Sequence, residues 1–173
     1  MKAIKTNCNF QREPLKSPFG FKGGYLSELW QVSAYMQSQC GNQAIGLGTQ
    51  STLWSDAHVF ASNSESAGNS MMFLMTSYAL EKVKQTEWDT PFDLLDKILP
   101  DVYEYGKTVT QNHKLRLTFA LNSLVAVDNA AWLIYCRDKG IASFDDMLPN
   151  DIKPALNCRH RRLANIPLMS YNV

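Results

Sequence analysis

The sequence contains no long hydrophobic run, few cysteines and little glycine or proline. No uninterrupted apolar stretch approaches the roughly 20 residues of a membrane-spanning helix, and the first ten residues include two lysines but no apolar core of a secretory signal. Glycine (9) and proline (7) are too scarce for a collagen-like chain, and 45% hydrophobic residues exclude a disordered one. We therefore expect a soluble cytoplasmic protein of one or at most two globular domains, with no membrane contact.

Four cysteines occur, and none is placed for a structural metal site. Cys8, Cys40, Cys136 and Cys158 form no Cys-x-x-Cys pair and have no histidine at zinc-finger spacing. A chain of this length buries about two thirds of the surface that it exposes when unfolded, so its core requires neither metals nor disulfides. We expect reduced thiols that pack as small apolar residues.

The net charge of +1, from 17 basic and 16 acidic side chains, argues against a dedicated nucleic-acid binder. The charges are unevenly distributed along the chain. Residues 1–24 carry five basic groups and one acidic group, and residues 151–173 carry four and one, so the two ends together hold +7 and the middle holds −6. Two explanations stay open: a solvated surface, or ends that border an anionic ligand or an acidic neighbouring domain.

Common catalytic signatures are absent from the sequence. It has no P-loop, no His-Glu-x-x-His zinc motif and no Gly-x-Ser-x-Gly nucleophile elbow. Gly46 and Gly48 belong to a predicted strand, since no helix opens directly after them. His58 in a predicted loop, His113 and His160 have no convincing carboxylate and nucleophile partners. We assign no catalytic residue and no metal ligand to this chain.

Residues 1–52 have the pattern of an antiparallel meander. Residues 29–38 alternate in polarity, which predicts a strand with one buried side. Residues 14–24 lack any period and are rich in glycine and proline, which predicts a mobile loop. The apolar side of 29–38 consists of Trp30, Val32, Ala34 and Met36, and the other predicted strands span residues 3–8 and 44–49.

From residue 64 onward the hydrophobic period becomes helical, and cap residues mark the helix ends. The predicted helices run from Ser64 or Ser66 to about Lys84, from Thr90-Pro91 past a kink or restart at Pro100, from Lys114 to Lys139 with Gly140 as C-cap, and from Ser143 to Leu148. A meander followed by a helical bundle places the chain in the α+β class.

The long predicted helix carries an unusual carboxylate, Asp128. An unpaired charge on an apolar face costs several kcal/mol, so Asp128 is expected to bond backbone donors or an arginine, or to face a neighbouring domain. Trp132 lies one turn further along and is expected in the core. The predicted core face contains Leu117, Leu121, Leu124, Val125, Asp128, Ala131, Trp132 and Tyr135.

The same helix contains a distinctive motif. It reads Ala-Val-Asp-Asn-Ala-Ala-Trp at 126–132, then Arg-Asp-Lys-Gly-Ile at 137–141 and Met-Leu-Pro at 147–149. This pattern resembles the last helix of the capping domain in the enolase superfamily, apart from Leu133, Ser143 and Pro149, where the family has Asp, Pro and Gly. The order of strand, loop, hairpin and helical bundle also resembles the mandelate racemase and muconate lactonizing branch, and residues 166–171 resemble its entry into the first barrel strand.

The resemblance implies that residues 1–150 form an enolase-like capping domain, and residues 151–173 a linker and the first-strand stub of a C-terminal β/α barrel. In the family the barrel supplies the catalytic bases and the ligands of Mg²⁺, so this chain is expected to be inactive alone. Loops of the cap close over the barrel and shape specificity. The positions that match these loops are Phe19, Phe21, Lys22, Tyr25, Trp54 and His58.

The complete enzyme implied by the resemblance abstracts a proton next to the carboxylate of a small substrate. It would act as a racemase, epimerase, dehydratase or cycloisomerase, and it would be a homo-oligomer. The partner of this chain would be its own barrel domain or a second fragment that supplies one. Without a barrel we expect Ile166, Leu168 and Met169 to pack poorly on the cap. The alternative is a stand-alone α+β module that binds a partner or a small acid without catalysis.

Overall fold

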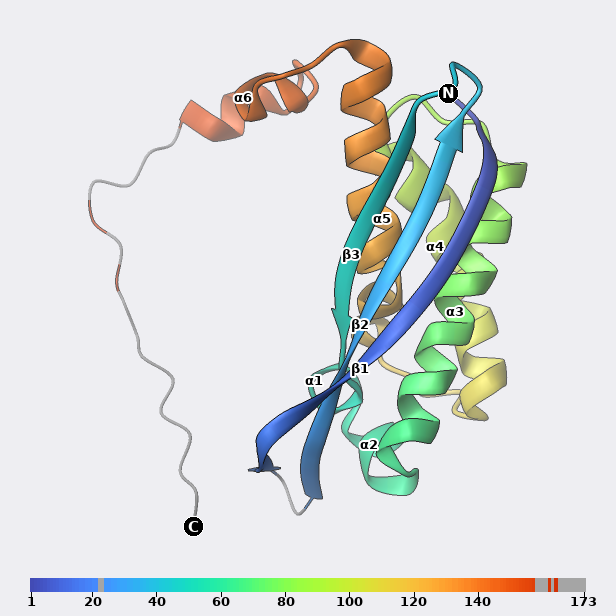
Figure 1. Ribbon diagram of the computed structural model, residues 1–173, viewed down its shortest axis with the longest axis vertical. Helices are drawn as coiled ribbons and strands as arrows, with labels where there is room; N and C mark the ends of the chain where they lie inside the picture. The colour runs from blue at the N-terminus through green and yellow to red at the C-terminus, as the bar shows by residue number, and fades with distance from the viewer. Residues whose placement is uncertain (22–23, 158–161, 163, 165–173) are drawn as a thin grey trace.

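A computed structural model describes residues 1–21, 24–157, 162 and 164, and it begins with three antiparallel strands in the order β1–β2–β3 (Figure 1). These strands are β1 (Ala3–Phe21), β2 (Gly24–Ser38) and β3 (Gln43–Gln50). The predicted alternation is confirmed, because one side of β2 is buried. Its buried apolar residues include Trp30, Val32, Ala34 and Met36.

The first two strands form a longer hairpin than the sequence predicts. Residues 14–24 were expected to be a mobile loop, yet Pro14 pairs with Glu28 and Phe19 pairs with Leu26, with a register shift between the two pairs. That prediction is wrong because β1 is an edge strand, where the N–H that proline lacks is not needed for the ladder. Proline content therefore indicated a loop where the chain forms an irregular strand.

Helices follow the sheet, with caps that match the predictions. The Ser64 hydroxyl accepts from the Ala67 amide and the Thr90 hydroxyl accepts from the Asp93 amide, each at 3.2 Å. Gly140 ends the longest helix with φ of 66°, a left-handed conformation that favours glycine. The helices are α1 (Thr52–Ser55), α2 (Ala57–Ser62), α3 (Glu65–Gln85), α4 (Pro91–Thr110), α5 (Leu117–Lys139), α6 (Phe144–Met147) and the 3₁₀ helix η1 (Lys153–Asn157).

Three boundaries differ from the predictions. The longest helix starts at Leu117 rather than at Lys114, and α4 continues through Pro100, so the predicted restart is absent while a kink there stays a prediction. His58 was expected in a loop but lies in the first turn of α2, whose N-cap is Asp56. Short helices such as α1 and α2 do not complete enough turns to show a hydrophobic period. Ile166, Leu168 and Met169, which are predicted to pack poorly on the cap, lie outside the described residues.

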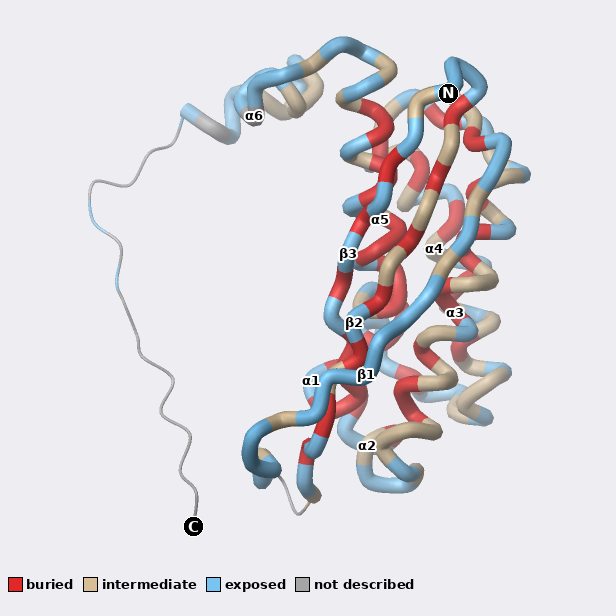
Figure 2. Tube along the Cα trace, viewed as in Figure 1, coloured by how far each residue is buried: buried red, intermediate tan, exposed pale blue. Residues whose placement is uncertain are grey.

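The sheet packs on α3 and α5, and α4 packs against both of these helices (Figure 1). Buried residues concentrate along the faces that the layers share (Figure 2). Trp88 and Phe119 are the largest fully buried side chains of this core. The layered arrangement confirms an α+β fold with a three-stranded antiparallel sheet followed by helices.

The backbones of β3 and α5 approach each other closely. A Cβ atom built at Gly46 would lie 2.1 Å from the carbonyl oxygen of Ala126, so glycine is required for this contact. The side chain of Asn129 donates to the Leu47 carbonyl at 2.7 Å, and that of Asn122 donates to the Thr49 carbonyl at 3.2 Å. Gly46 and Gly48 therefore lie in a strand, as predicted, and their lack of a side chain lets α5 pack closely against β3.

The core face of α5 differs from the predicted one. Its fully buried residues include Phe119, Ala120 and Ile134. By contrast, four residues form an exposed set that we call the outer face of α5: Leu117 (45% exposed), Leu121 (37%), Val125 (38%) and Leu133 (45%). Leu124, Ala131 and Tyr135 of the predicted face are buried as expected, so the prediction is right in part. It is wrong for the exposed residues because α5 is apolar on both sides, and its period does not select one.

One consequence of this composition is that α5 alone, among the described helices, is long and apolar enough to cross a membrane. Half of its most apolar stretch is buried inside the fold. A core helix of a globular protein has the same composition, and α5 packs as one against β2, β3, α3 and α4.

Candidate functional site

Two segments that the family resemblance assigns to a substrate lid touch each other in the structure. Phe19, near the tip of the β1–β2 hairpin, contacts Trp54 on α1, with ring centroids 5.9 Å apart and planes at 45°. Tyr25, on the opposite strand of the hairpin, is 71% exposed. The Phe21 side chain and Lys22 lie outside the described residues. The hairpin tip and α1 thus form one aromatic surface, which we call the hairpin end.

Helix α2 supports this hairpin end from the side. A Cβ atom built at Gly24 would lie 2.6 Å from the ring of Phe60, so the absence of a side chain at Gly24 lets Phe60 pack against the strand. Because α1 and α2 are joined at Asp56, the position of Trp54 is tied to the same support.

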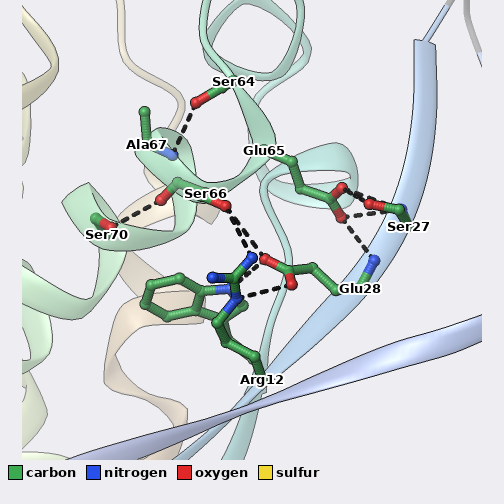
Figure 3. A network of polar contacts seen from close by, with 9 residues as sticks. Arg12, Ser27, Glu28, Ser64, Glu65, Ser66, Ala67 and Ser70 are labelled. Carbon is green, nitrogen blue, oxygen red and sulfur yellow. Dashed lines mark hydrogen bonds and ion pairs between the residues drawn. The ribbon is translucent and has the colours of Figure 1, made fainter.

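The hairpin is also held to the start of α3 by a carboxylate (Figure 3). Glu65, in the first turn of α3, accepts hydrogen bonds from the backbone amides of Ser27 and Glu28 at 3.0–3.1 Å and from the Ser27 hydroxyl. A negative side chain at this position also suits the positive end of the helix. These contacts fix where the outer half of the hairpin leaves the core.

A second carboxylate, Glu28, organises the polar groups beneath the hairpin. The Arg12 Nε donates to Glu28 Oε2 at 2.8 Å, and Trp30 Nε1 donates to Glu28 Oε1 at 2.9 Å, while the Ser66 hydroxyl lies 3.3 Å from Oε1 (Figure 3). Burial raises the pKa of the Glu28 carboxyl, but the hydrogen bonds from Arg12 and Trp30 and the charge of Arg12 outweigh it. The pKa of Glu28 therefore lies below its ordinary value.

His58 takes part in a different arrangement, which involves the loop between α4 and α5. The Asp56 carboxylate accepts from the backbone amides of His58 at 2.9 Å and Val59 at 3.0 Å, and also from the amide of Arg116 at 2.9 Å. His58 consequently borders a surface hollow together with Lys114 and Arg116. Sequence reasoning missed these two basic residues, because tertiary contacts such as that of Asp56 with the Arg116 amide bring them to His58.

Asp128 lies half-buried between α4 and α5 with no hydrogen bond or ion pair to the residues that the structure describes. Burial among apolar neighbours raises the pKa of its carboxyl. The expected backbone donor or arginine is therefore not found within residues 1–21 and 24–157. Its surroundings are Pro91, Leu94, Leu95, Ile98, Leu124, Val127 and Ala131.

Trp132, expected in the core, is only half-buried. Its ring packs edge-on against Phe92, with centroids 5.1 Å apart, and against Tyr135 at 5.9 Å. It lies beside the outer face of α5 in the same turn as Leu133. Asp128 and Trp132 thus mark the boundary between the buried side of α5 and its exposed side.

No three His, Cys, Asp or Glu side chains come together as metal ligands in the described part of the chain. The three cysteines in this part are free, and Cys8 and Cys136 pack partly buried against the core. Burial raises the pKa of both thiols, which disfavours their reactive thiolate forms.

Comparisons with known proteins show the fold to which this arrangement belongs. The sequence matches no protein-family model and no curated protein sequence. In structure, the L-talarate dehydratase from Polaromonas sp. JS666, solved with Mg and L-glucarate, matches with a TM-score of 0.50 at 14% identity, over 80% of this chain and 33% of that one.

Two further solved structures are similar. The L-talarate/galactarate dehydratase from Salmonella typhimurium LT2, solved with Mg and L-lyxarohydroxamate, matches with a TM-score of 0.50 at 15% identity, over 80% of this chain and 31% of that one. The L-Ala-D/L-Glu epimerase from Bacillus subtilis matches with a TM-score of 0.45 at 14% identity, over 80% of this chain and 32% of that one.

This chain spans about a third of the length of these enzymes. The two dehydratases share its fold, and sequence identities of 14% and 15% support a common fold but no common activity. The chain therefore has the fold of the corresponding third of these two dehydratases, a three-stranded antiparallel sheet followed by helices.

Proposed function

We propose that this chain is the capping domain of a metal-dependent enzyme that abstracts a proton next to the carboxylate of a small substrate. The observation that carries the proposal is the contact between Phe19 and Trp54 at the hairpin end. Resemblance alone assigns these residues to two separate lid segments, and in the folded chain they meet as one surface. Such a surface would close over a barrel mouth and exclude water.

The chemistry of the reaction would come from a barrel. Two of the enzymes that share the fold are named as dehydratases of sugar acids and were solved with Mg. Because the described residues bring no metal-ligand cluster together, the Mg²⁺ ligands and the bases would belong to the barrel. Phe19, Trp54 and Tyr25 would contact the part of the substrate that lies away from its reacting carbon.

The outer face of α5 would be the surface on which this barrel packs. Its leucines and valine are exposed, and the half-buried Asp128 and Trp132 lie next to them. Exposed apolar patches of this kind mark interaction sites. A barrel is the occupant that the matches favour, because each matched dehydratase has about two thirds of its chain beyond the part that corresponds to this one. A basic side chain from the barrel would then pair with Asp128.

Steady-state kinetics of this chain joined to its barrel would test the lid role. Trp54→Ala removes the ring that meets Phe19, and it should lower kcat/KM by about tenfold to hundredfold through lost positioning. Trp54→Phe keeps an aromatic ring and serves as the matched control, with activity close to that of the parent. Equal kcat/KM for all three proteins would contradict the lid role.

A further inference from the structure

We propose that the hollow between α2 and the α4–α5 loop binds a small oxyanion, a carboxylate or a phosphate group. The hollow has a volume of about 320 Å³ and opens to solvent. Its lining residues are Asp56, Ala57, His58, Asn112, Lys114 and Arg116. The proposal does not depend on the capping role, since this chain alone supplies every residue of the site.

Four side chains around the hollow carry hydrogen-bond donors that have no partner in the part of the chain that the structure describes. The Lys114 ammonium, the Arg116 guanidinium, the His58 ring and the Asn112 amide nitrogen make no hydrogen bond or ion pair within the described residues. Lysines on α4 behave differently: Lys107 pairs with Glu104 at 2.6 Å, and Lys97 pairs with Asp93 at 2.8 Å. Cationic donors that converge without an acidic partner form the chemistry that recognises carboxylates and phosphates.

The backbone that carries these donors is held in place on both sides of the hollow. Leu115, between the two basic residues, is 1% exposed, and its carbonyl accepts a hydrogen bond from the Tyr103 hydroxyl. The Leu115 amide donates to the Asn112 carbonyl at 3.0 Å, which closes the turn. With Leu115 anchored in the core, Lys114 and Arg116 on either side of it are exposed at fixed positions. Such preorganisation lowers the entropic cost of binding.

Asp56 is the one carboxylate among the lining residues, and it does not neutralise the site. It is 2% exposed, and its two oxygens accept three backbone N–H groups, from His58, Val59 and Arg116. Its role is to position His58 and Arg116 on either side of the hollow. With Lys114 and Arg116 against one carboxylate, the hollow keeps a net charge of +1 when His58 is neutral.

Titration of the 173-residue chain with inorganic phosphate and with malonate, followed by NMR at constant ionic strength, tests the proposal. We expect saturable shifts at His58, Lys114 and Arg116 with at least one of the two anions. Tighter binding of phosphate would indicate a phosphorylated ligand, and tighter binding of malonate a carboxylate. The absence of saturable binding with both anions would overturn the proposal.

Paired charge variants separate a specific site from general attraction. Lys114→Gln with Arg116→Gln should weaken binding about tenfold or more, because charge-assisted hydrogen bonds are lost. Lys5→Gln with Lys139→Gln removes the same charge from two exposed lysines elsewhere and should leave the affinity unchanged. Equal weakening by both pairs would overturn the proposal. All variants replace exposed side chains, and circular dichroism would verify that they fold.

The experiments distinguish a failure of the anion-site proposal from a failure of the proposed capping role. The anion titration uses the chain without a barrel, while the lid role is measured as turnover with one. A chain that binds neither anion could still cap a barrel, and a chain that binds both could still lack one.

Discussion

At the scale of single residues, Asp128 shows how an apolar surrounding acts on a charge. Its carboxyl lies half-buried among aliphatic side chains of α4 and α5, and burial raises its pKa above the ordinary value. A raised carboxyl pKa means that ionisation costs more in the folded chain than in the unfolded one. The charge of Asp128 therefore destabilises the chain as long as no partner compensates it.

We predict that Asp128→Asn stabilises the isolated chain at pH 7 and not at pH 3. The destabilising contribution of Asp128 is absent below the unfolded-state pKa and grows as the pH rises through the ordinary and then the raised pKa. Asparagine has nearly the same shape and no charge, so the gain appears only where the aspartate is ionised. For a chain of this size, 1 kcal/mol corresponds to about 2–4 °C in Tm. A loss of stability at pH 7 would mean that Asp128 has a favourable partner.

Among the described glycines, Gly46 has the least room for an added side chain. Gly46→Ala should lower the free energy of unfolding by about 1–3 kcal/mol or more, because the new methyl group would meet the backbone of α5. Urea denaturation measures the change. Gly48→Ala should cost less, since its nearest backbone contact is 2.8 Å rather than 2.1 Å. Leu47→Ala, at a side chain that is 66% exposed, should change stability by no more than about 0.5 kcal/mol.

At the scale of elements, the long hairpin depends on contacts that lie far from its tip. Glu65 binds two consecutive amides of β2, and Glu28 collects donors from Arg12 and Trp30. These contacts hold the outer part of the hairpin to α3. They are needed there because most of the core lies toward the other end of the strands. The hairpin end is thus positioned by α3 as well as by the sheet.

We predict that Glu65→Ala frees the outer hairpin without unfolding the core. Amide hydrogen exchange at Ser27 and Glu28 should become about tenfold faster or more, because these amides lose their acceptor. Exchange at Met36, in the middle of the sheet, should not change. Glu13→Ala removes an exposed acid of the same hairpin and is the matched control. Unchanged exchange at Ser27 and Glu28 would show that the hairpin holds its position without α3.

The helix ends that have cap residues were predictable from the sequence because caps are local, whereas the start of α5 at Leu117 has no side-chain cap and was predicted at Lys114. Ser64, Thr90-Pro91 and Gly140 each act within one turn, and all three function as expected. The core face of α5 was predictable only in part, because both of its sides are apolar and the packing against the sheet decides which one is covered. The outer hairpin was misread for a related reason: its prolines are tolerated in an edge strand only once a partner strand has formed.

At the scale of the whole molecule, the candidate sites depend on contacts between distant segments. Resemblance supplied Phe19 and Trp54, and the contact between them required the fold. The basic hollow had no signal in the sequence, because 58 residues separate His58 from Arg116 and a single carboxylate, Asp56, joins their backbones. The sequence therefore predicts the architecture, and the resemblance assigns the candidate lid residues. Only the tertiary structure brings together the basic residues of the proposed anion site.

The central claim is that this chain caps a barrel, and the mass of the native protein tests it most directly. An antibody against the chain would isolate the protein from its source for native and denaturing mass spectrometry. We predict a mass per copy about two to three times the 19.5 kDa of this chain, because the chain corresponds to 33% of the matched dehydratase. Denaturing conditions would tell one polypeptide from two. A protein of 19.5 kDa, alone or only with copies of itself, would contradict the account.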